Sequence, residues 1–114
     1  MVPHGMSVIV NAPSVFRFTS PACPDRHLDG ARLLGAQAPD AAPEAAGEAL
    51  AQRLIGLMRA AGIPNGVGGV GYGKGDLPAL ARGAFAQQRL IKNAPRSVDE
   101  AGLEELFAGA LTYW

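Results

Sequence analysis

The sequence predicts an all-α fold, a single helical bundle that spans residues 1–114. Three observations support this prediction: apolar residues recur at helical spacing in five segments, helix-starting and helix-ending residues bound most of these segments, and few stretches suit a strand. A chain of 114 residues that is 48% hydrophobic is large enough for one domain with one core. The low charged fraction, 18%, is typical of a domain that buries much of its surface or packs against another.

The first predicted helix covers about residues 5–18. Residues 7–10 taken alone also suit a strand, because short β-branched runs are ambiguous. Pro13 has no N–H and clashes with the carbonyl four residues back, so it should kink a helix here. The apolar face of this helix consists of Val8, Ala12 and Val15.

A second helix is predicted over residues 25–34, with Asp25 as its N-cap and Gly35 as the left-handed residue that ends it. Residues 36–43 then form a loop, which Pro39 and Asp40 mark. The apolar stripe of this helix consists of Leu28, Ala31 and Leu34.

The third helix has the clearest pattern and should cover about residues 44–61. Gly62 should end it, since Pro64 follows closely. Its stripe follows the spacing of a core-facing helix and consists of Leu50, Leu54, Leu57, Met58 and Ala61.

A glycine-rich segment, residues 62–75, follows. Residues 68–74 match the spacing of a phosphate-binding loop, G-x-x-x-x-G-K, but Gly75 stands where Ser or Thr would hold magnesium, and no strand is predicted before the loop. The glycines do not form a complete dinucleotide-binding fingerprint either. We therefore interpret the segment as a flexible connector, with Tyr72 and Lys74 on the surface.

Two further helices complete the chain. Asp76 should cap the fourth, and the continuation of that helix over residues 87–93 stays open. The last should open with a capping box formed by Ser97 and Glu100. The stripe of the fourth helix consists of Leu77, Leu80, Ala81 and Ala84, and that of the last helix of Leu103, Leu106, Phe107, Ala110 and Trp114.

Composition excludes several classes of function. Ten basic residues balance ten acidic ones without clusters, so we expect no nucleic-acid partner. We expect no membrane span and no secretory signal, since no apolar run is long enough and no basic residue precedes the short N-terminal one. Cys23 is the only cysteine, which excludes an internal disulfide and a cysteine-based zinc site and favours a reduced, cytoplasmic protein.

Single residues give little sign of catalysis. Cys23 is interpreted as an inert thiol, although His27, four residues on, is the base that a nucleophilic thiol would need. His4 and His27 show no metal-ligand spacing, and each is interpreted from spacing alone as solvated. The carboxylate pairs one helical turn apart are interpreted as capping and solubility groups; they are Asp25 with Asp29 and Glu100 with Glu104.

The segment from Pro3 to Phe18 resembles a signature of iron-containing alcohol dehydrogenases: Pro-His-Gly, then a helix, with a proline nine residues after the histidine. It is most similar to the hydroxyacid-oxoacid transhydrogenase branch, which has His-Gly-Met-Ser-Val followed by Pro-x-Val-Phe-x-Phe-Thr; here these are His4–Val8 and Pro13–Thr19. The similarity continues through residues 24–28, 33–36, 71–80 and 93–96.

This resemblance implies the C-terminal helical domain of such an enzyme, a dehydroquinate synthase-like helical domain that faces a nucleotide-binding domain across the active site. Iron(II) or zinc would be held by one Asp and three His, the last of which maps onto His4. Full-length members use NAD, and the transhydrogenase branch moves a hydride from 4-hydroxybutyrate to 2-oxoglutarate. A metal of this kind polarises the substrate oxygen.

The sequence holds neither the nucleotide-binding domain nor the other three ligands, so we expect no cofactor-binding residues here and no activity or bound cofactor for the chain alone. The missing domain, upstream or on a separate chain, would be its partner. The alternatives are a non-catalytic helical interaction module and a decayed fragment. A separated domain would also self-associate through an exposed apolar interface, to which Met6, Ile9 and Phe16 are expected to contribute.

Overall fold

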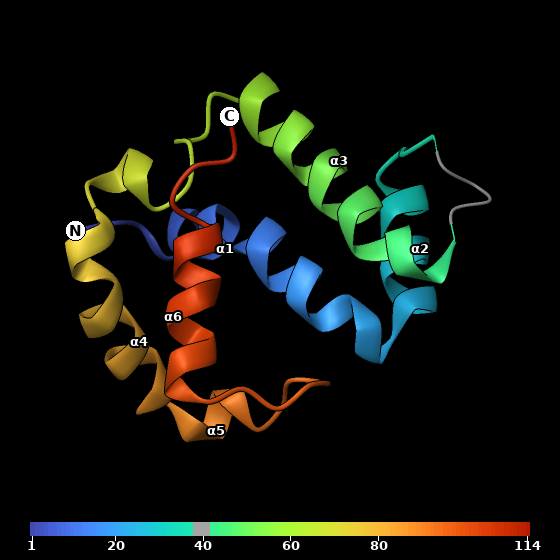
Figure 1. Cartoon of the computed structure of the whole chain (residues 1–114). Helices are drawn as coiled ribbons and strands as arrows, with labels where there is room; N and C mark the ends of the chain where they lie inside the picture. Colours follow the sequence, from blue (N-terminus) through green and yellow to red (C-terminus); the bar gives the residue numbers. More distant parts are fainter. Residues whose placement is uncertain (38–41) are drawn as a thin grey trace.

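The computed structural model describes residues 1–37 and 42–114. These residues form helices and turns but no strand, so the all-α prediction is confirmed and the strand alternative for residues 7–10 is wrong. The α-helices, labelled in Figure 1, are α1 His4–Thr19, α2 Pro24–Leu33, α3 Ala46–Ala60, α4 Leu77–Phe85, α5 Gln88–Ile91 and α6 Glu100–Gly109. Short 3₁₀ turns lie at Ser20–Ala22, Pro43–Ala45, Gly68–Val70 and Lys74–Asp76.

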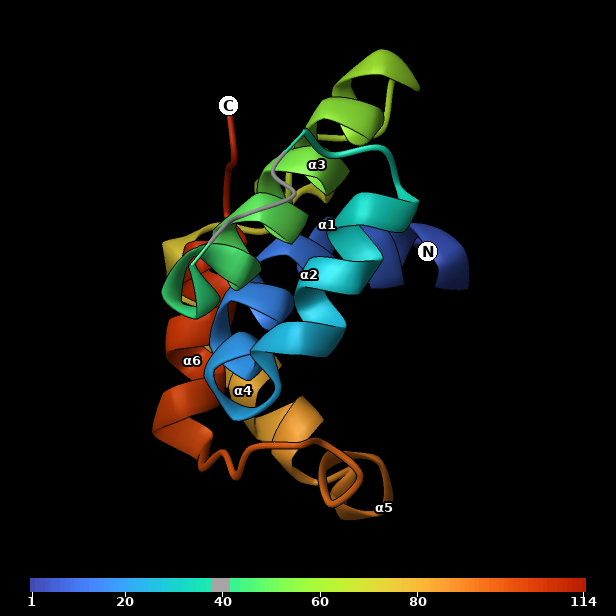
Figure 2. The ribbon, with the colours of Figure 1, turned by 90° about the vertical axis from the view of Figure 1, so that its right-hand side faces the viewer.

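The helices form two packed groups that α1 joins. Both α1 and α2 pack against α3, and α4 packs against α6. Contacts between α1 and α6 connect the two groups, as Figures 1 and 2 show. A buried cluster of Val10, Val67 and Ala110 lies where α1, the glycine-rich segment and the end of α6 meet. The core of the junction is therefore built from three distant parts of the chain.

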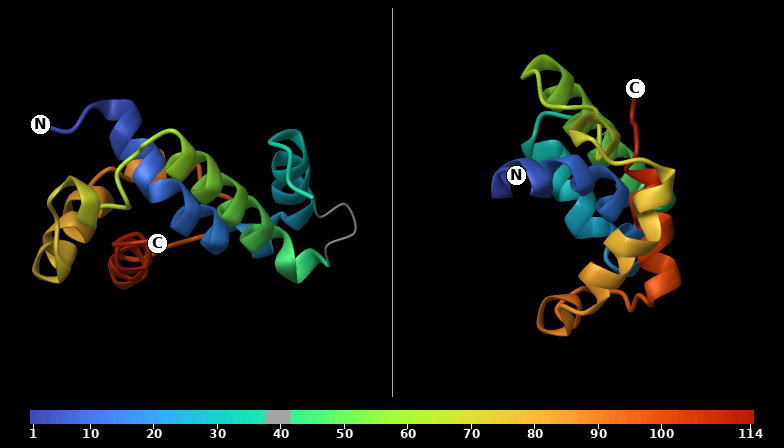
Figure 3. Two further views of the ribbon diagram at one scale, coloured as in Figure 1. Left: turned by 90° about the horizontal axis from the view of Figure 1, so that it is seen from above. Right: turned by 90° about the vertical axis from the view of Figure 1, so that its left-hand side faces the viewer.

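Helix α1 contains Pro13 and continues past it to Thr19. Its ribbon changes direction partway along, in Figure 1 and in the left view of Figure 3. A proline inside a helix leaves the carbonyl four residues back without its N–H partner, which accounts for such a bend. The predicted kink is thus confirmed, and Pro13 itself is buried.

Helix α2 begins one residue earlier than predicted, and its N-cap position holds Cys23 instead of Asp25. Because Pro24 occupies the first helical position, Asp25 falls in the first turn, where its charge still favours the positive end of the helix dipole. The end is as predicted: Gly35 has φ 89°, and the N–H of Ala36 donates to the carbonyl of Ala31 at 2.9 Å. Part of the predicted loop, including Pro39 and Asp40, lies outside the described residues.

The buried face of α3 is rotated from the predicted stripe. Leu57 and Ala61 are exposed, although Leu50 and Met58 are buried as predicted. The helix packs against α1 and α2 together, so its contact face is set by two neighbours and includes small residues. That face consists of Ala46, Gly47, Leu50, Ala51, Ile55 and Met58. The predicted end is confirmed, because Gly62 has φ 71°.

Asp76 occupies the N-cap position of α4, as predicted, but its carboxylate accepts from the N–H of Gly73 at 2.8 Å in the 3₁₀ turn and makes no cap bond to α4. The capping box predicted for the last helix is wrong. Helix α6 is capped by Asp99, which accepts from the N–H of Gly102 at 2.7 Å, and not by a box from Ser97 to Glu100. A carboxylate three residues before a helical N–H caps as well as a hydroxyl does, so the local pattern allowed both starts.

The sequence left open whether the fourth helix continues over residues 87–93. It does not, because this segment forms a separate short helix, α5. The stripe predicted for α6 runs too far. Leu103 and Ala110 are buried, but Trp114 lies beyond the end of the helix at Gly109 and is exposed. Residues 111–114 instead form a tail that returns to the glycine-rich segment, where the N–H of Tyr113 donates to Asn65 Oδ1.

Candidate functional site

His4 is the first residue of α1 and is exposed. The backbone around it is held in place: the Ser7 hydroxyl donates to the carbonyl of His4 at 2.7 Å, and the N–H of Ser7 donates to the carbonyl of Pro3 at 3.0 Å. An ordered helix start therefore presents an imidazole to the outside of the domain.

The described residues do not gather the other donors that a metal needs. Within residues 1–37 and 42–114 no group of three or more His, Cys, Asp or Glu side chains lies close enough to hold an ion. Structural and catalytic zinc sites take three or four protein ligands, and imidazole suits both zinc and iron. His4 therefore fits a metal as one ligand among several.

A small pocket of about 130 Å³ lies against α1, beginning about one turn after His4. Ser7 and Asn11 stand three and seven residues after His4 and so share its face of the helix. The Asn11 side chain donates to the carbonyl of Ser7 at 2.8 Å. The rest of the lining is mostly apolar and consists of Val2, Val10, Val67, Val70, Tyr72, Leu80 and Phe107.

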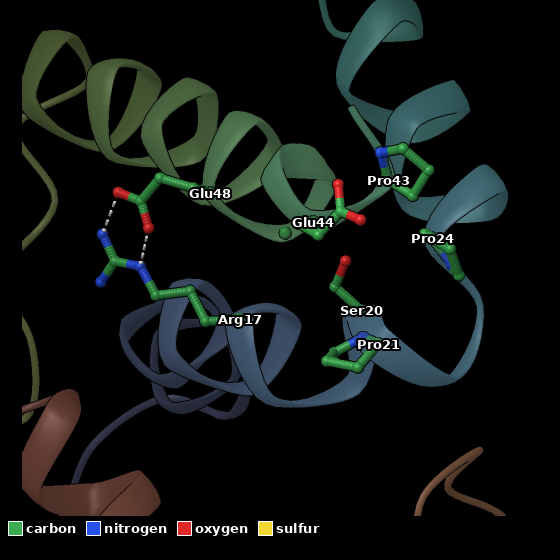
Figure 4. Close-up of a pocket in the computed structure, with 8 residues that line it drawn as sticks. Arg17, Ser20, Pro21, Pro24, Pro43, Glu44 and Glu48 are labelled. Carbon is green, nitrogen blue, oxygen red and sulfur yellow. Dashed lines mark hydrogen bonds and ion pairs between the residues drawn. The ribbon is translucent and has the colours of Figure 1, made fainter. Parts of the chain in front are cut away.

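A larger cavity, about 510 Å³, lies elsewhere, between the end of α1 and the start of α3 (Figure 4). Two charged residues of its lining, Arg17 and Glu48, are paired with each other: Arg17 Nε donates to Glu48 Oε2 at 2.7 Å and Nη2 to Oε1 at 2.9 Å. These bonds lower the pKa of Glu48, helped by a bond from Gln52, and the bond to Glu48 raises the pKa of Arg17. The arrangement is a link between two helices and not a reactive pair.

A second, apolar groove of about 480 Å³ runs between α2 and α3. Phe16 from α1 and Leu50 from α3 line it, and Leu33, which is 87% exposed, stands at its edge. We expected an exposed apolar interface to include Met6, Ile9 and Phe16. Each of them is only partly exposed, and Met6 and Ile9 pack against the core cluster.

His27 is 7% exposed, so the prediction of a solvated side chain is wrong. Its Nδ1 lies 2.8 Å from the carbonyl oxygen of Cys23, which can only accept, so Nδ1 carries the proton. Nε2 lies 2.7 Å from the Thr19 hydroxyl, which gives the buried ring a second polar partner. The edge-on ring of Phe16 completes the surroundings. Sequence reasoning missed this pairing because Thr19 belongs to the preceding helix.

The same geometry argues against a Cys23–His27 catalytic pair. The Cys23 sulfur lies 3.6 Å from His27 Nδ1, but that nitrogen already carries a proton and directs it to the Cys23 carbonyl. A protonated nitrogen cannot take the thiol proton, so His27 does not activate Cys23 through it.

The glycine-rich segment is an ordered support for the C-terminus. The N–H groups of Val67 and Gly68 donate to the carbonyls of Ala110 and Leu111 at 2.8 and 2.9 Å, so they do not cradle a phosphate. A Cβ on Gly66 would lie 2.2 Å from the Ala110 carbonyl oxygen, which explains the glycine there. The interpretation of this segment as a flexible connector is therefore wrong. As predicted, Tyr72 and Lys74 are exposed.

The remaining predictions concern charge and membranes. The acidic residues at 25, 29, 100 and 104 are all exposed, as solubility groups should be. Asp29 lies 3.6 Å from Arg32, one turn along α2. Among residues 1–37 and 42–114 no helix is both long and apolar enough to cross a membrane.

Comparison with known proteins points to one family. The model of the Fe-containing alcohol dehydrogenase family, C-terminal part, matches residues 1–111. The chain is 37% identical over its whole length to the probable mitochondrial hydroxyacid-oxoacid transhydrogenase of Dictyostelium discoideum, of which it covers 21%. It is 40% identical over 111 residues to the mitochondrial hydroxyacid-oxoacid transhydrogenases of Pongo abelii and Homo sapiens, with 97% of this chain and 24% of theirs covered.

The fold has a counterpart among solved structures. The crystal structure of a 1,3-propanediol oxidoreductase superposes with a TM-score of 0.84 at 27% identity, over 96% of this chain and 28% of that one. The chain thus spans between a fifth and about a quarter of the length of these relatives. The match confirms that the helical bundle corresponds to one part of a longer enzyme architecture.

Proposed function

Because this chain belongs to the iron-containing alcohol dehydrogenase family, we propose that it is the helical domain that completes the metal site of a hydride-transferring oxidoreductase. The observation that carries the proposal is the exposed His4 at the start of α1, inside a region that the family model matches from residue 1. The described residues hold no group of three or more His, Cys, Asp or Glu side chains that could bind an ion, so the remaining ligands would come from a nucleotide-binding domain.

In this proposal His4 is one of the ligands of iron(II) or zinc, and its partner domain binds NAD. The metal would supply Lewis-acid polarisation of the substrate oxygen during hydride transfer. The chain's own part is to hold an imidazole at a fixed helix start, on the helix face that Ser7 and Asn11 continue into the mostly apolar 130 Å³ pocket. The domain alone is then inactive.

The proposed reaction is hydride transfer from a hydroxy acid such as 4-hydroxybutyrate to 2-oxoglutarate. It is supported by the 37–40% identity to proteins named hydroxyacid-oxoacid transhydrogenase. The compartment stays a prediction: the single cysteine favours a reduced cytoplasm, whereas the named relatives are mitochondrial.

Zinc binding tests the role of His4. Purified domain alone and domain assembled with a nucleotide-binding domain are compared by metal content and zinc titration, for wild type, His4→Ala and His27→Gln. The proposal expects tight zinc only in the assembly. In the assembly, His4→Ala should lower the zinc affinity by more than about 100-fold. Loss of an outer-shell partner costs only about 10- to 100-fold. His27→Gln changes the other histidine, which is buried, and should keep the zinc stoichiometry.

Two results would contradict the proposal. Tight zinc binding by the isolated domain would mean that His4 has ligand partners within this chain. Equal zinc binding by wild type and His4→Ala in the assembly would remove the metal role and favour a non-catalytic helical interaction module.

A further inference from the structure

The direction of the first half of α1 decides where His4 points. Nine residues separate His4 from Pro13, which at 1.5 Å per residue is a lever of about 13 Å. A change of about 10° at the bend would move His4 by about 2 Å, whereas metal–ligand distances tolerate only about 0.2 Å. Something must therefore fix the bend.

The bend is held by a residue from the other end of the chain. The Tyr113 hydroxyl donates to the carbonyl of Val10 at 2.9 Å and accepts from the N–H of Ser14 at 3.3 Å. Val10 lies three residues before Pro13 and Ser14 lies directly after it. The two bonds therefore hold the turn of α1 in which the proline's own N–H is missing. Burial raises the pKa of Tyr113, so the hydroxyl keeps its proton and can donate at neutral pH.

The surroundings of Tyr113 are fixed in turn. Its N–H donates to Asn65 Oδ1 at 2.6 Å, which ties the tail to the glycine-rich segment. Directly after Pro13, the Ser14 hydroxyl donates to the carbonyl of Leu106 at 2.7 Å. A Cβ on Gly109 would lie 2.9 Å from that hydroxyl, so α6 approaches the bend closely.

We propose that Tyr113 is a positioning residue for His4: its hydroxyl sets the angle between the two halves of α1 and so aims the imidazole. The proposal rests on the proposed function only in taking His4 as a metal ligand. Its structural part, the control of the bend by a C-terminal phenol, stands on the hydrogen bonds alone.

The two tyrosines provide a matched experiment. Tyr113→Phe removes only the hydroxyl, and Tyr72→Phe makes the same change at a residue that is 41% exposed. Amide hydrogen exchange is followed in residues 8–12 of α1 and in α3. A lost hydrogen bond of about 0.5–1.5 kcal/mol corresponds to about 2- to 10-fold faster exchange. We expect this acceleration in residues 8–12 beyond any change in α3, for Tyr113→Phe and not for Tyr72→Phe.

A second measurement links the bend to the metal. In the domain assembled with a nucleotide-binding domain, Tyr113→Phe should weaken zinc binding several-fold. Uniform acceleration across α1 and α3, or none, would overturn the proposal whatever His4 does. If His4→Ala abolishes zinc binding but Tyr113→Phe retains wild-type zinc affinity, the positioning role alone is wrong. If His4→Ala retains zinc, the proposed function fails, and the exchange data still decide whether Tyr113 controls the bend.

Discussion

Two glycines of α3 illustrate how single residues fix the packing. A Cβ on Gly47 would lie 2.6 Å from Cβ of Ser20 and 3.2 Å from the Phe16 carbonyl oxygen, so this glycine lets α3 approach the end of α1. Gly56, in the same helix, has nothing within 4 Å of a built Cβ and is exposed. The same residue type is thus required at one position and merely tolerated at the other.

Alanine should therefore have opposite effects at these positions. In a helix, Gly→Ala gains up to about 1 kcal/mol, and overpacking costs about 1–3 kcal/mol. We expect Gly56→Ala to raise the free energy of unfolding by about 0.5–1 kcal/mol and Gly47→Ala to lower it by about 1–2 kcal/mol. Urea denaturation followed by circular dichroism measures both, and equal stabilisation by the two variants would contradict the close approach.

At the scale of elements, α1 and α3 are linked by a bidentate ion pair between Arg17 and Glu48. The Glu48 side chain is 54% exposed, so solvent screens the pair and its contribution is about 0.5–1 kcal/mol. Its geometry, with two parallel hydrogen bonds, is the favourable one for arginine and a carboxylate. The pair thus adds orientation to a contact that apolar burial drives.

The lowered pKa of Glu48 gives this link a pH dependence. A carboxylate whose folded-state pKa lies below its ordinary value of 4.5 stabilises the fold fully above that value, and the contribution is lost as pH falls through the lower folded-state pKa. We expect Glu48→Gln to lower the free energy of unfolding by about 0.5 kcal/mol at pH 7. The difference from wild type should vanish well below pH 4.5.

The control for this prediction is Glu44→Gln, one helical turn earlier, in the 3₁₀ turn that precedes α3. Denaturation curves at several pH values compare the variants. A loss from Glu48→Gln that stays constant down to acid pH would show that the carboxylate charge is not what links the helices.

At the scale of the whole molecule, the C-terminal tail binds back to the glycine-rich segment. Asn65 Oδ1 accepts from the N–H groups of Tyr113 and Trp114 at 2.6 and 3.3 Å, and its Nδ2 donates to the Trp114 carbonyl. Arg59 lies over the Trp114 ring at 5.6 Å. This tail connects the end of α3, the glycine-rich segment and the bend of α1, so the two helix groups depend on each other.

Removing the Asn65 amide should therefore destabilise the whole domain. Asn65→Ala leaves backbone groups of the tail without partners, which costs about 1–3 kcal/mol. Asn93→Ala is the control, because Asn93 is exposed and its side chain donates to the Arg89 carbonyl at 3.2 Å; its effect should stay within about 0.5 kcal/mol. Thermal unfolding measures both, and similar melting temperatures for the two variants would argue against a closing role for the tail.

The sequence alone determined the features that depend on neighbouring residues. Helix existence follows from apolar spacing, the kink follows from Pro13, and the helix ends follow from Gly35 and Gly62, which both have positive φ. The resemblance at residues 3–18 also identified the family, because a signature of this kind is read from consecutive residues and needs no packing. His4 as a ligand remains a prediction from that resemblance.

Only the tertiary structure decided what depends on distant partners. It rotated the buried face of α3, buried His27 against Thr19, and assigned the glycine-rich segment to the carbonyls of Ala110 and Leu111. It also brought Tyr113 to the bend of α1, 103 residues from Val10. Local periodicity and capping preferences do not determine which segments meet. That choice is made by burial of apolar surface and by the need of each buried polar group for a partner.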